Sequence, residues 1–224
     1  ERIRRINGAS GIISTVAGTG TGGFSGDFGL ATAASISQVT GLTIDSSGNI
    51  YIASIGNGRV RKFTHGGIIS TVAGGGGGGE GSLATAAALL IPRDVSVDAT
   101  GNLYIADEQA NKIYRVDFVS QILTTLAGTG QWGFSGDGGL ATAAELRSPT
   151  GVSVDASGDI FVADMGNNRI RIVNPILGLI DTFAGGNNGD GAAASTARLG
   201  LVTHVAVDAT GNIFVADATM NQVR

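Results

Sequence analysis

Cysteine is absent from this 224-residue chain, and histidine occurs only at His65 and His204. These absences exclude disulfide bonds, thiolate metal ligands and a zinc centre built from three histidines. No apolar run approaches the roughly 18 residues of a membrane-spanning helix. The net charge is −4, and the chain has no block of basic residues. We therefore expect no membrane span in this chain, no transition-metal cofactor and no nucleic-acid partner.

Glycine, in contrast, is abundant, with 38 residues that follow no collagen-like period. The glycines cluster between segments typical of strands, where turns need a positive φ angle. The chain is 42% hydrophobic and 14% charged. This composition supplies enough apolar surface for a folded core and lacks the high charge of a disordered chain.

One phrase is repeated along the chain. Val95–Asp107 reads V-S-V-D-A-T-G-N-L-Y-I-A-D, with apolar and polar residues alternating in the first half and an apolar run in the second. The alternation predicts a strand with one buried face, and the run predicts a strand covered on both faces. The turn residues between them predict a tight hairpin. The phrase recurs at Leu42–Ser54, Val152–Asp164 and Val205–Asp217, so the chain is a repeat protein.

Each complete repeat continues with two more predicted strands. The repeats cover approximately residues 39–74, 92–128 and 149–185, and a fourth is divided between residues 1–18 and 203–224. Four strands with a doubly covered second strand are typical of a β-propeller blade. We predict an all-β fold, a single propeller domain over residues 1–224 in which the N- and C-terminal strands complete one blade. A parallel β-helix is the main rival, but its coils are much shorter and lack hairpin turns.

The connectors between the repeats reveal a second period. Two long connectors, Gly18–Leu30 and Gly128–Leu140, contain F-S-G-D and alternate with two short connectors that lack it. Equivalent residues such as Asp45 and Asp155 are 110 positions apart, which indicates the duplication of a two-repeat unit. Each connector ends in an alanine-rich segment for which we predict a short helix docked on a sheet. These segments are Leu30–Ile36, Leu83–Leu89, Leu140–Leu146 and Ala193–Leu199.

The segment Gly151–Arg171, G-V-S-V-D-A-S-G-D-I-F-V-A-D-M-G-N-N-R-I-R, resembles the NHL repeat. The linker T-V-A-G-T-G…G-F-S-G-D…A-T-A-A is similar to the variety common in bacterial, often secreted or surface, NHL proteins. The resemblance implies a propeller that acts as an interaction platform, outside the cell or at its surface, with the periplasm as an alternative. Related propellers include lyases and lactonases with a metal in the central channel, and the family commonly closes with six blades.

The repeated aspartates could suggest a metal site. Their recurrence at one place in every repeat favours turn capping instead, because a single active site needs unlike residues that converge. Calcium is an alternative for the S-G-D segments Ser25–Asp27 and Ser135–Asp137 and for Asn187–Asp190, whose oxygens it could use. We expect a capping role for the aspartates and no cofactor. The aspartates are Asp45, Asp98, Asp155 and Asp208, with Asp107, Asp164 and Asp217.

Repeats differ from one another just before the innermost strand. His204 and Asp94 occupy a position that is glycine in the other repeats, and Arg93 stands where the others have threonine. In a propeller this position borders the central channel, so Arg93, Asp94 and His204 are candidate binding residues. The alternative is drift at an exposed rim. Trp132 and Phe134 form an aromatic pair on a long connector, which either binds a partner or pins the loop to its own blade.

These features favour a non-enzymatic scaffold or binding module of a bacterial extracytoplasmic protein. A protein or glycan partner is compatible with it, as is self-assembly through the terminal strands. The alternative is a lyase- or lactonase-like enzyme with a site at the central channel, which would need several unlike polar residues there.

Overall fold

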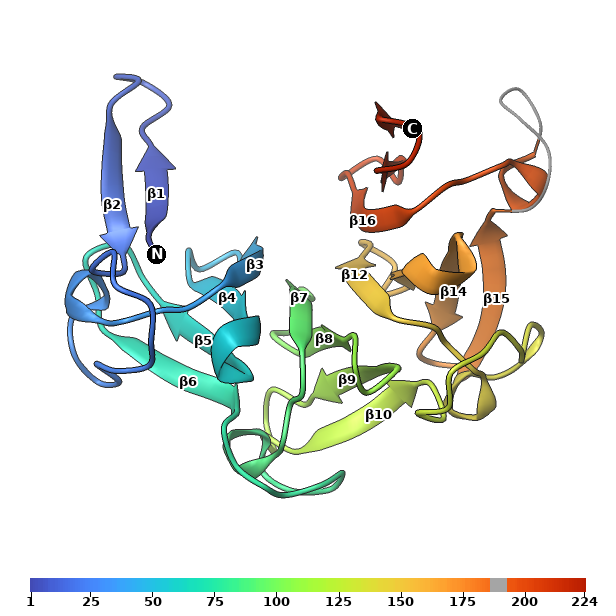
Figure 1. Ribbon diagram of the computed structural model, residues 1–224, viewed down its shortest axis with the longest axis horizontal. Helices are drawn as coiled ribbons and strands as arrows, with labels where there is room; N and C mark the ends of the chain where they lie inside the picture. The colour runs from blue at the N-terminus through green and yellow to red at the C-terminus, as the bar shows by residue number, and fades with distance from the viewer. Residues whose placement is uncertain (186–192) are drawn as a thin grey trace.

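The computed structural model describes residues 1–185 and 193–224. It shows antiparallel sheets that follow one another around an open arc, each turned relative to the one before (Figure 1). The first blade holds β3 (Val39–Ile44), β4 (Ile50–Ser54), β5 (Arg59–Phe63) and β6 (Ile69–Gly74). The second holds β7 (Pro92–Val97), β8 (Leu103–Asp107), β9 (Lys112–Val116) and β10 (Leu123–Ala127). The third holds β12 (Pro149–Val154), β13 (Ile160–Asp164), β14 (Arg169–Asn174) and β15 (Leu179–Ala184), with β11 (Gly139–Leu140) at its outer edge.

The second strand of each of these blades is its most buried element. All five residues of β4, β8 and β13 are buried, as the unbroken apolar runs predicted. The inner strands β3, β7 and β12 line the inside of the arc, and consecutive inner strands pack against one another. The all-β propeller architecture is therefore confirmed. No helix in the described residues has the length and apolarity to cross a bilayer.

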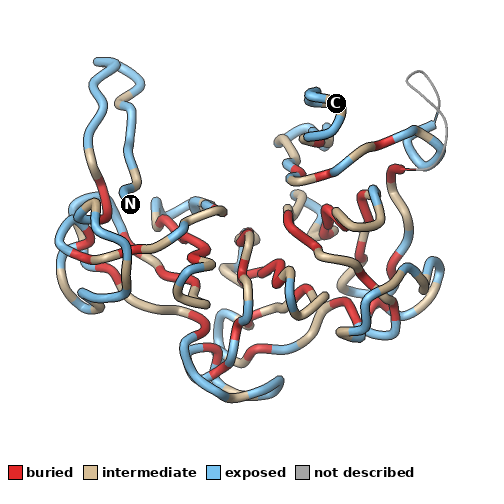
Figure 2. The backbone as a smooth tube through the Cα atoms, viewed as in Figure 1, coloured by how far each residue is buried: buried red, intermediate tan, exposed pale blue. Residues whose placement is uncertain are grey.

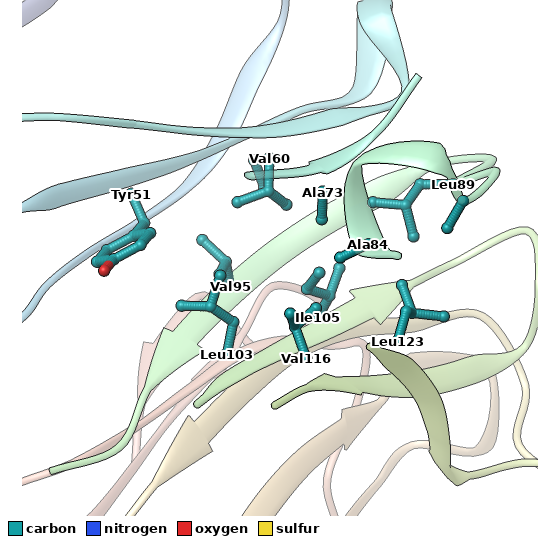
Figure 3. Packing of buried hydrophobic residues seen from close by; sticks show 12 residues of the cluster. Tyr51, Val60, Ala73, Ala84, Leu89, Val95, Leu103, Ile105, Val116 and Leu123 are labelled. Atoms are coloured by element: carbon teal, nitrogen blue, oxygen red, sulfur yellow. The ribbon is translucent and has the colours of Figure 1, made fainter. Parts of the chain in front are cut away.

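The core consists of layers between neighbouring blades, seen as buried stretches along the inside of each sheet (Figure 2). In the layer between the first and second blades, Tyr51 and Val60 face Val95, Ile105 and other apolar residues (Figure 3). The aromatic position of the second strand is buried in three blades: Tyr51 is 5% exposed, Tyr104 3% and Phe161 4%. Its fourth member, Phe214, is 46% exposed.

The alanine-rich segments form single 3-10 turns instead of the predicted helices. Each turn has three residues and ends in extended backbone, so the chain bends once and continues along the blade. Ala31, Ala34 and Ile36 are completely or almost completely buried, which explains the small residues at this point. The turns are η1 (Ala31–Ala33), η3 (Ala84–Ala86), η4 (Ala141–Ala143) and η6 (Ala194–Thr196), and η2 (Ile55–Asn57) and η5 (Met165–Asn167) follow second strands.

The terminal strands differ from the prediction that they complete one blade. β1 (Ile3–Ile6) and β2 (Ile13–Ala17) form one sheet at one end of the arc. β16 (Val202–Val207), β17 (Ile213–Asp217) and β18 (Gln222–Val223) form a separate sheet at the other end. β18 itself pairs with β17 and takes the third-strand position that the prediction gave to β1. Each terminal sheet packs on its neighbouring blade, so the arc stays open.

Candidate functional site

A cleft of roughly 400 Å³ lies at the inside of the arc, where the inner strands converge. Threonine, serine and apolar side chains form much of its wall, with the titratable groups of Asp94 and His204 among them. Asp94 is the first residue of β7 after its register shift and pairs with Ala106, and His204 occupies the equivalent place on β16 and pairs with Ala216. The structure therefore brings together two of the three inner candidates.

Asp94 uses its carboxylate to join two blades. Its Oδ1 accepts the backbone N–H of Val95 at 2.9 Å, and its Oδ2 accepts that of Val152 in the third blade at 3.0 Å. Burial raises the pKa of Asp94 to about 6, although these two hydrogen bonds and the nearby His204 favour the charged form. Because both oxygens are engaged, the carboxylate is a structural link between blades.

Close backbone approach explains the glycines at this level. A Cβ on Gly41 would lie 2.5 Å from Oδ1 of Asp94, and one on Gly151 would lie 3.0 Å from Cα of His204. Thr40 donates its hydroxyl to the carbonyl of Arg93 at 2.7 Å. At the equivalent place, 110 residues further on, Thr150 donates to the carbonyl of Thr203 at 2.9 Å. The glycine–threonine pairs thus connect the first blade to the second and the third to the C-terminal sheet, in agreement with a duplicated two-blade unit.

Arg93 and His204 have different surroundings. The Arg93 guanidinium pairs with Glu108 of its own blade and does not line the cleft. His204 lines the cleft and is exposed, so its imidazole is accessible to a ligand. His204 therefore remains the accessible inner candidate, while Arg93 and Asp94 already have protein partners.

The recurrent aspartates cap turns, as the sequence predicted. Each hairpin aspartate accepts backbone N–H groups two and four residues ahead, for example Asp98 from Thr100 and Asn102, both at 2.9 Å. Asp98 also accepts the Tyr104 hydroxyl at 3.0 Å, and burial together with this carboxylate raises the pKa of Tyr104 to about 12. The buried Asp107 accepts the N–H groups of Leu90 and Ile91 in the preceding connector.

Arginine side chains occupy the places suggested for calcium. Asp27 accepts Arg61 Nε at 2.9 Å and the hydroxyl of Thr71 at 2.7 Å. Asp137 is paired with Arg171 at 2.7 Å. These carboxylates are neutralised by the protein, which leaves them unsuited to a cation. Asn187–Asp190 lies outside the described residues, and the remainder of the chain contains no cluster of three metal-ligating side chains.

Sequence reasoning missed these two ion pairs, each between an aspartate of a long connector and a buried arginine. Arg61 and Arg171 are fully buried although their strands alternate like ordinary surface strands. The signal was present as a correlation: both blades with an F-S-G-D connector carry arginine in the middle of the third strand, whereas the second blade has Tyr114 there. A buried arginine requires an acid nearby, and the insert supplies it.

Each of the two aromatic candidates on the long connector has an arginine guanidinium packed against its ring. The Arg147 guanidinium lies 4.0 Å from the centre of the Trp132 ring, and that of Arg169 lies 4.1 Å from the centre of the Phe134 ring. Trp132 is 63% exposed and Phe134 is 41% exposed. The arginines fix the position of the rings on the blade, while a large part of each ring faces solvent. Neither ring lines the inner cleft, so the site candidates fall into two groups.

The family model of the NHL repeat matches residues 146–173, which include β12 and β13. The matched pattern recurs in the other blades, with the same hairpin aspartates and the same buried second strand. The chain is an NHL-repeat β-propeller protein. Its NHL blades explain why the repeated polar residues serve turns and blade contacts.

Similar proteins include a teneurin, a component of a nidogen/laminin complex and a lyase. Human teneurin-4 is 31% identical over 196 residues, which cover 76% of this NHL-repeat chain and 7% of teneurin-4. A crystal structure of a nidogen/laminin complex superposes with a TM-score of 0.64 and 16% identity over 97% of this chain and 67% of that chain. A catalytically inactive virginiamycin B lyase from Staphylococcus aureus, with quinupristin, superposes with a TM-score of 0.58 and 17% identity, over 99% and 58% of the two chains. The chain spans a small part of teneurin-4 and less than two thirds of the lyase, and the structural likeness shows the fold alone.

Proposed function

We propose that this NHL-repeat chain is a non-enzymatic scaffold or binding module of a bacterial extracytoplasmic protein. The observation that carries the proposal is the use of the Asp94 carboxylate. Both of its oxygens hold backbone N–H groups, and Arg93 is paired with Glu108. An acid–base or metal mechanism needs several free, unlike polar groups that converge on a substrate. Of the titratable groups among the described residues that line the inner cleft, this leaves His204 as the exposed one.

The resemblance to secreted and surface NHL proteins supports the extracytoplasmic setting. The similar fold in the nidogen/laminin structure belongs, by its description, to a complex between proteins. We propose that the partner is a protein or a glycan, which the surface of this chain binds. Self-assembly through the terminal strands stays a prediction.

The lyase- or lactonase-like alternative rests on the fold of the virginiamycin B lyase and on the exposed His204 in the cleft. A turnover assay distinguishes the two functions. The purified chain and its His204→Ala variant are incubated with lactones and with a cyclic depsipeptide, in the presence of Mg²⁺ or Zn²⁺. We expect no turnover above buffer by either protein. Turnover by the native chain that disappears in the variant would show an enzyme with a site at the channel.

A second arm tests the binding role directly. The immobilised chain is exposed to panels of extracellular protein domains and of glycans, with unlabelled chain as competitor. Saturable binding that the competitor abolishes is expected. An inert surface in both panels would contradict the binding role and leave a purely structural one.

A further inference from the structure

The two long connectors share one internal design. In the first, Phe24 lies against Arg59, with 3.9 Å from ring centre to guanidinium, and Asp27 binds the buried Arg61. In the second, 110 residues further on, Phe134 lies against Arg169 and Asp137 binds Arg171. Each connector also accepts a hydrogen bond from an asparagine of its own blade. Asn57 donates to the carbonyl of Gly23 at 2.9 Å, and Asn167 donates to that of Gly133 at 2.8 Å. These contacts attach each connector to its own blade and explain the phenylalanines.

Among the residues that differ between the two halves of the chain, three on the third-blade side add an aromatic ring or a positive charge, and Glu145 in place of Ser35 adds a negative one. Trp132, Arg147 and Arg198 stand where the chain has Gly22, Ser37 and Ala88 at the equivalent positions. The first connector builds the same phenylalanine–arginine–aspartate arrangement without a tryptophan or its arginine. The Trp132–Arg147 pair is therefore not needed to hold the connector in place.

The geometry of Trp132 suits recognition. Its backbone forms a bridge with Leu146, and the N–H of Gly133 donates to the Leu146 carbonyl at 3.3 Å. One ring face is covered by the Arg147 guanidinium, yet the residue is 63% exposed. A large aromatic that is already held in position loses little entropy on binding, and exposed Trp and Arg are the residues that most often dominate interfaces.

The surface around this tryptophan is basic. Arg147 packs against Gly166, the neighbour of Asn167, and Asn167 begins the wall of a cleft of roughly 530 Å³ between the third blade and the C-terminal sheet. Arg169 and Arg198 line the same cleft. In the described part of the chain, no carboxylate forms an ion pair with Arg147, Arg169 or Arg198. Two acids lie beside this surface: Asp137 of the connector is paired with Arg171, and the side chain of Glu145 lies against Gly133.

We propose that Trp132, Arg147, Arg169 and Arg198 form a docking surface for an acidic polypeptide segment of a partner protein. This inference rests on the proposed binding role and gives it a place and a partner chemistry. The guanidinium groups present fixed donors that match carboxylates, and Trp132 supplies apolar contact beside them. The chain as a whole carries a net charge of −4, so the surface is a local exception that steers an acidic segment to one place.

Trp132 is the only tryptophan, so its fluorescence reports directly on this surface. The intact chain is titrated with a short peptide of alternating aspartate and glutamate, with a lysine peptide of equal length as control. We expect saturable quenching by the acidic peptide that weakens with added salt. Arg147→Ser and Arg198→Ala should each weaken binding by about tenfold. Arg4→Ala together with Arg5→Ala removes two exposed arginines from β1 and should leave binding unchanged.

The double variant Trp132→Gly, Arg147→Ser reproduces Gly22 and Ser37 of the first connector, so it should remain folded, as circular dichroism during heating will show. A labelled acidic peptide followed by anisotropy should no longer bind this variant. Three results would overturn the proposal: no response to the acidic peptide, equal loss of binding in the Arg4/Arg5 control, or binding of an acidic oligosaccharide in place of the peptide. None of these results bears on turnover, so a failure here is distinct from the finding of an enzyme.

Discussion

Oδ2 of Asp94 in the second blade accepts the backbone N–H of Val152 in the third blade at 3.0 Å. This bond joins the inner strands of two blades at the wall of the cleft, and Asp94 is only 7% exposed. A charged group in this position is stabilised by its hydrogen bonds and opposed by desolvation. Its ionisation is therefore coupled to the stability of the joined blades.

Asp94→Asn tests this coupling through its pH dependence. Burial raises the Asp94 pKa from 3.8 to about 6 in the folded chain. The stabilisation due to this group is fully present below about pH 4 and is lost as the pH rises through 6, with a limit of about 3 kcal/mol. The stability of the variant relative to the native chain should therefore increase between about pH 4 and pH 7, as urea unfolding measures.

Asp98→Asn is the matched control, for which the change of stability with pH should have the opposite sign. Burial raises the pKa of Asp98, but hydrogen bonds from Asn102, Thr100 and Tyr104 together outweigh this and lower it below 3.8. Its stabilisation is present above about pH 4 and is lost as the pH falls further. Relative to the native chain, this variant should become less stable as the pH rises to about 4. The same direction of change in both variants would contradict the two assignments.

The ion pair under the first connector should be costly to break. Asp27→Ala leaves the fully buried Arg61 without its carboxylate, which typically costs about 3–5 kcal/mol. Glu80→Ala is the control, because Glu80 accepts the same type of hydrogen bonds from Thr125 in the second blade but is exposed and has no buried arginine. We expect its free energy of unfolding to fall by about 1 kcal/mol or less. Equal losses in the two variants, measured by chemical unfolding, would show that the arginine adds nothing.

Because the second strand of a complete blade is covered on both faces, the loss of stability on truncating its aromatic residue should depend on whether that residue is buried. Phe161 is 4% exposed and packs edge-on against Phe183, with 5.1 Å between ring centres. Phe161→Ala should lower the free energy of unfolding by about 3–5 kcal/mol. Phe214 occupies the same place in the C-terminal sheet but is 46% exposed, so Phe214→Ala should cost clearly less. A melting temperature unchanged by Phe161→Ala would contradict the layer between the blades.

Local patterns in the sequence were sufficient for the strands and turns. The apolar run of β8 and the capping role of Asp98 follow from residues close in sequence, because burial on two faces and an Asx turn are both local in their causes. The pair of Asp27 and Arg61 spans 34 positions, and each partner by itself is typical of a solvated surface residue. The open arc depends on the rotation between blades, which is determined by side-chain packing and not by any one repeat.

Strand edges at the two terminal sheets lead to the last prediction. Ile6 on β1 is 67% exposed and Val223 on β18 is 74% exposed, so both of these outer strands carry exposed apolar side chains. Unpaired edges recruit other strands, and a head-to-tail contact between β1 and the C-terminal sheet of a second copy would cover both. Sedimentation velocity over the micromolar range should show association that grows with concentration. Ile6→Lys places a charge on the edge and should reduce association without changing the fold, because the side chain already faces solvent. A native chain that stays monomeric at every concentration would show that the terminal strands do not pair between copies.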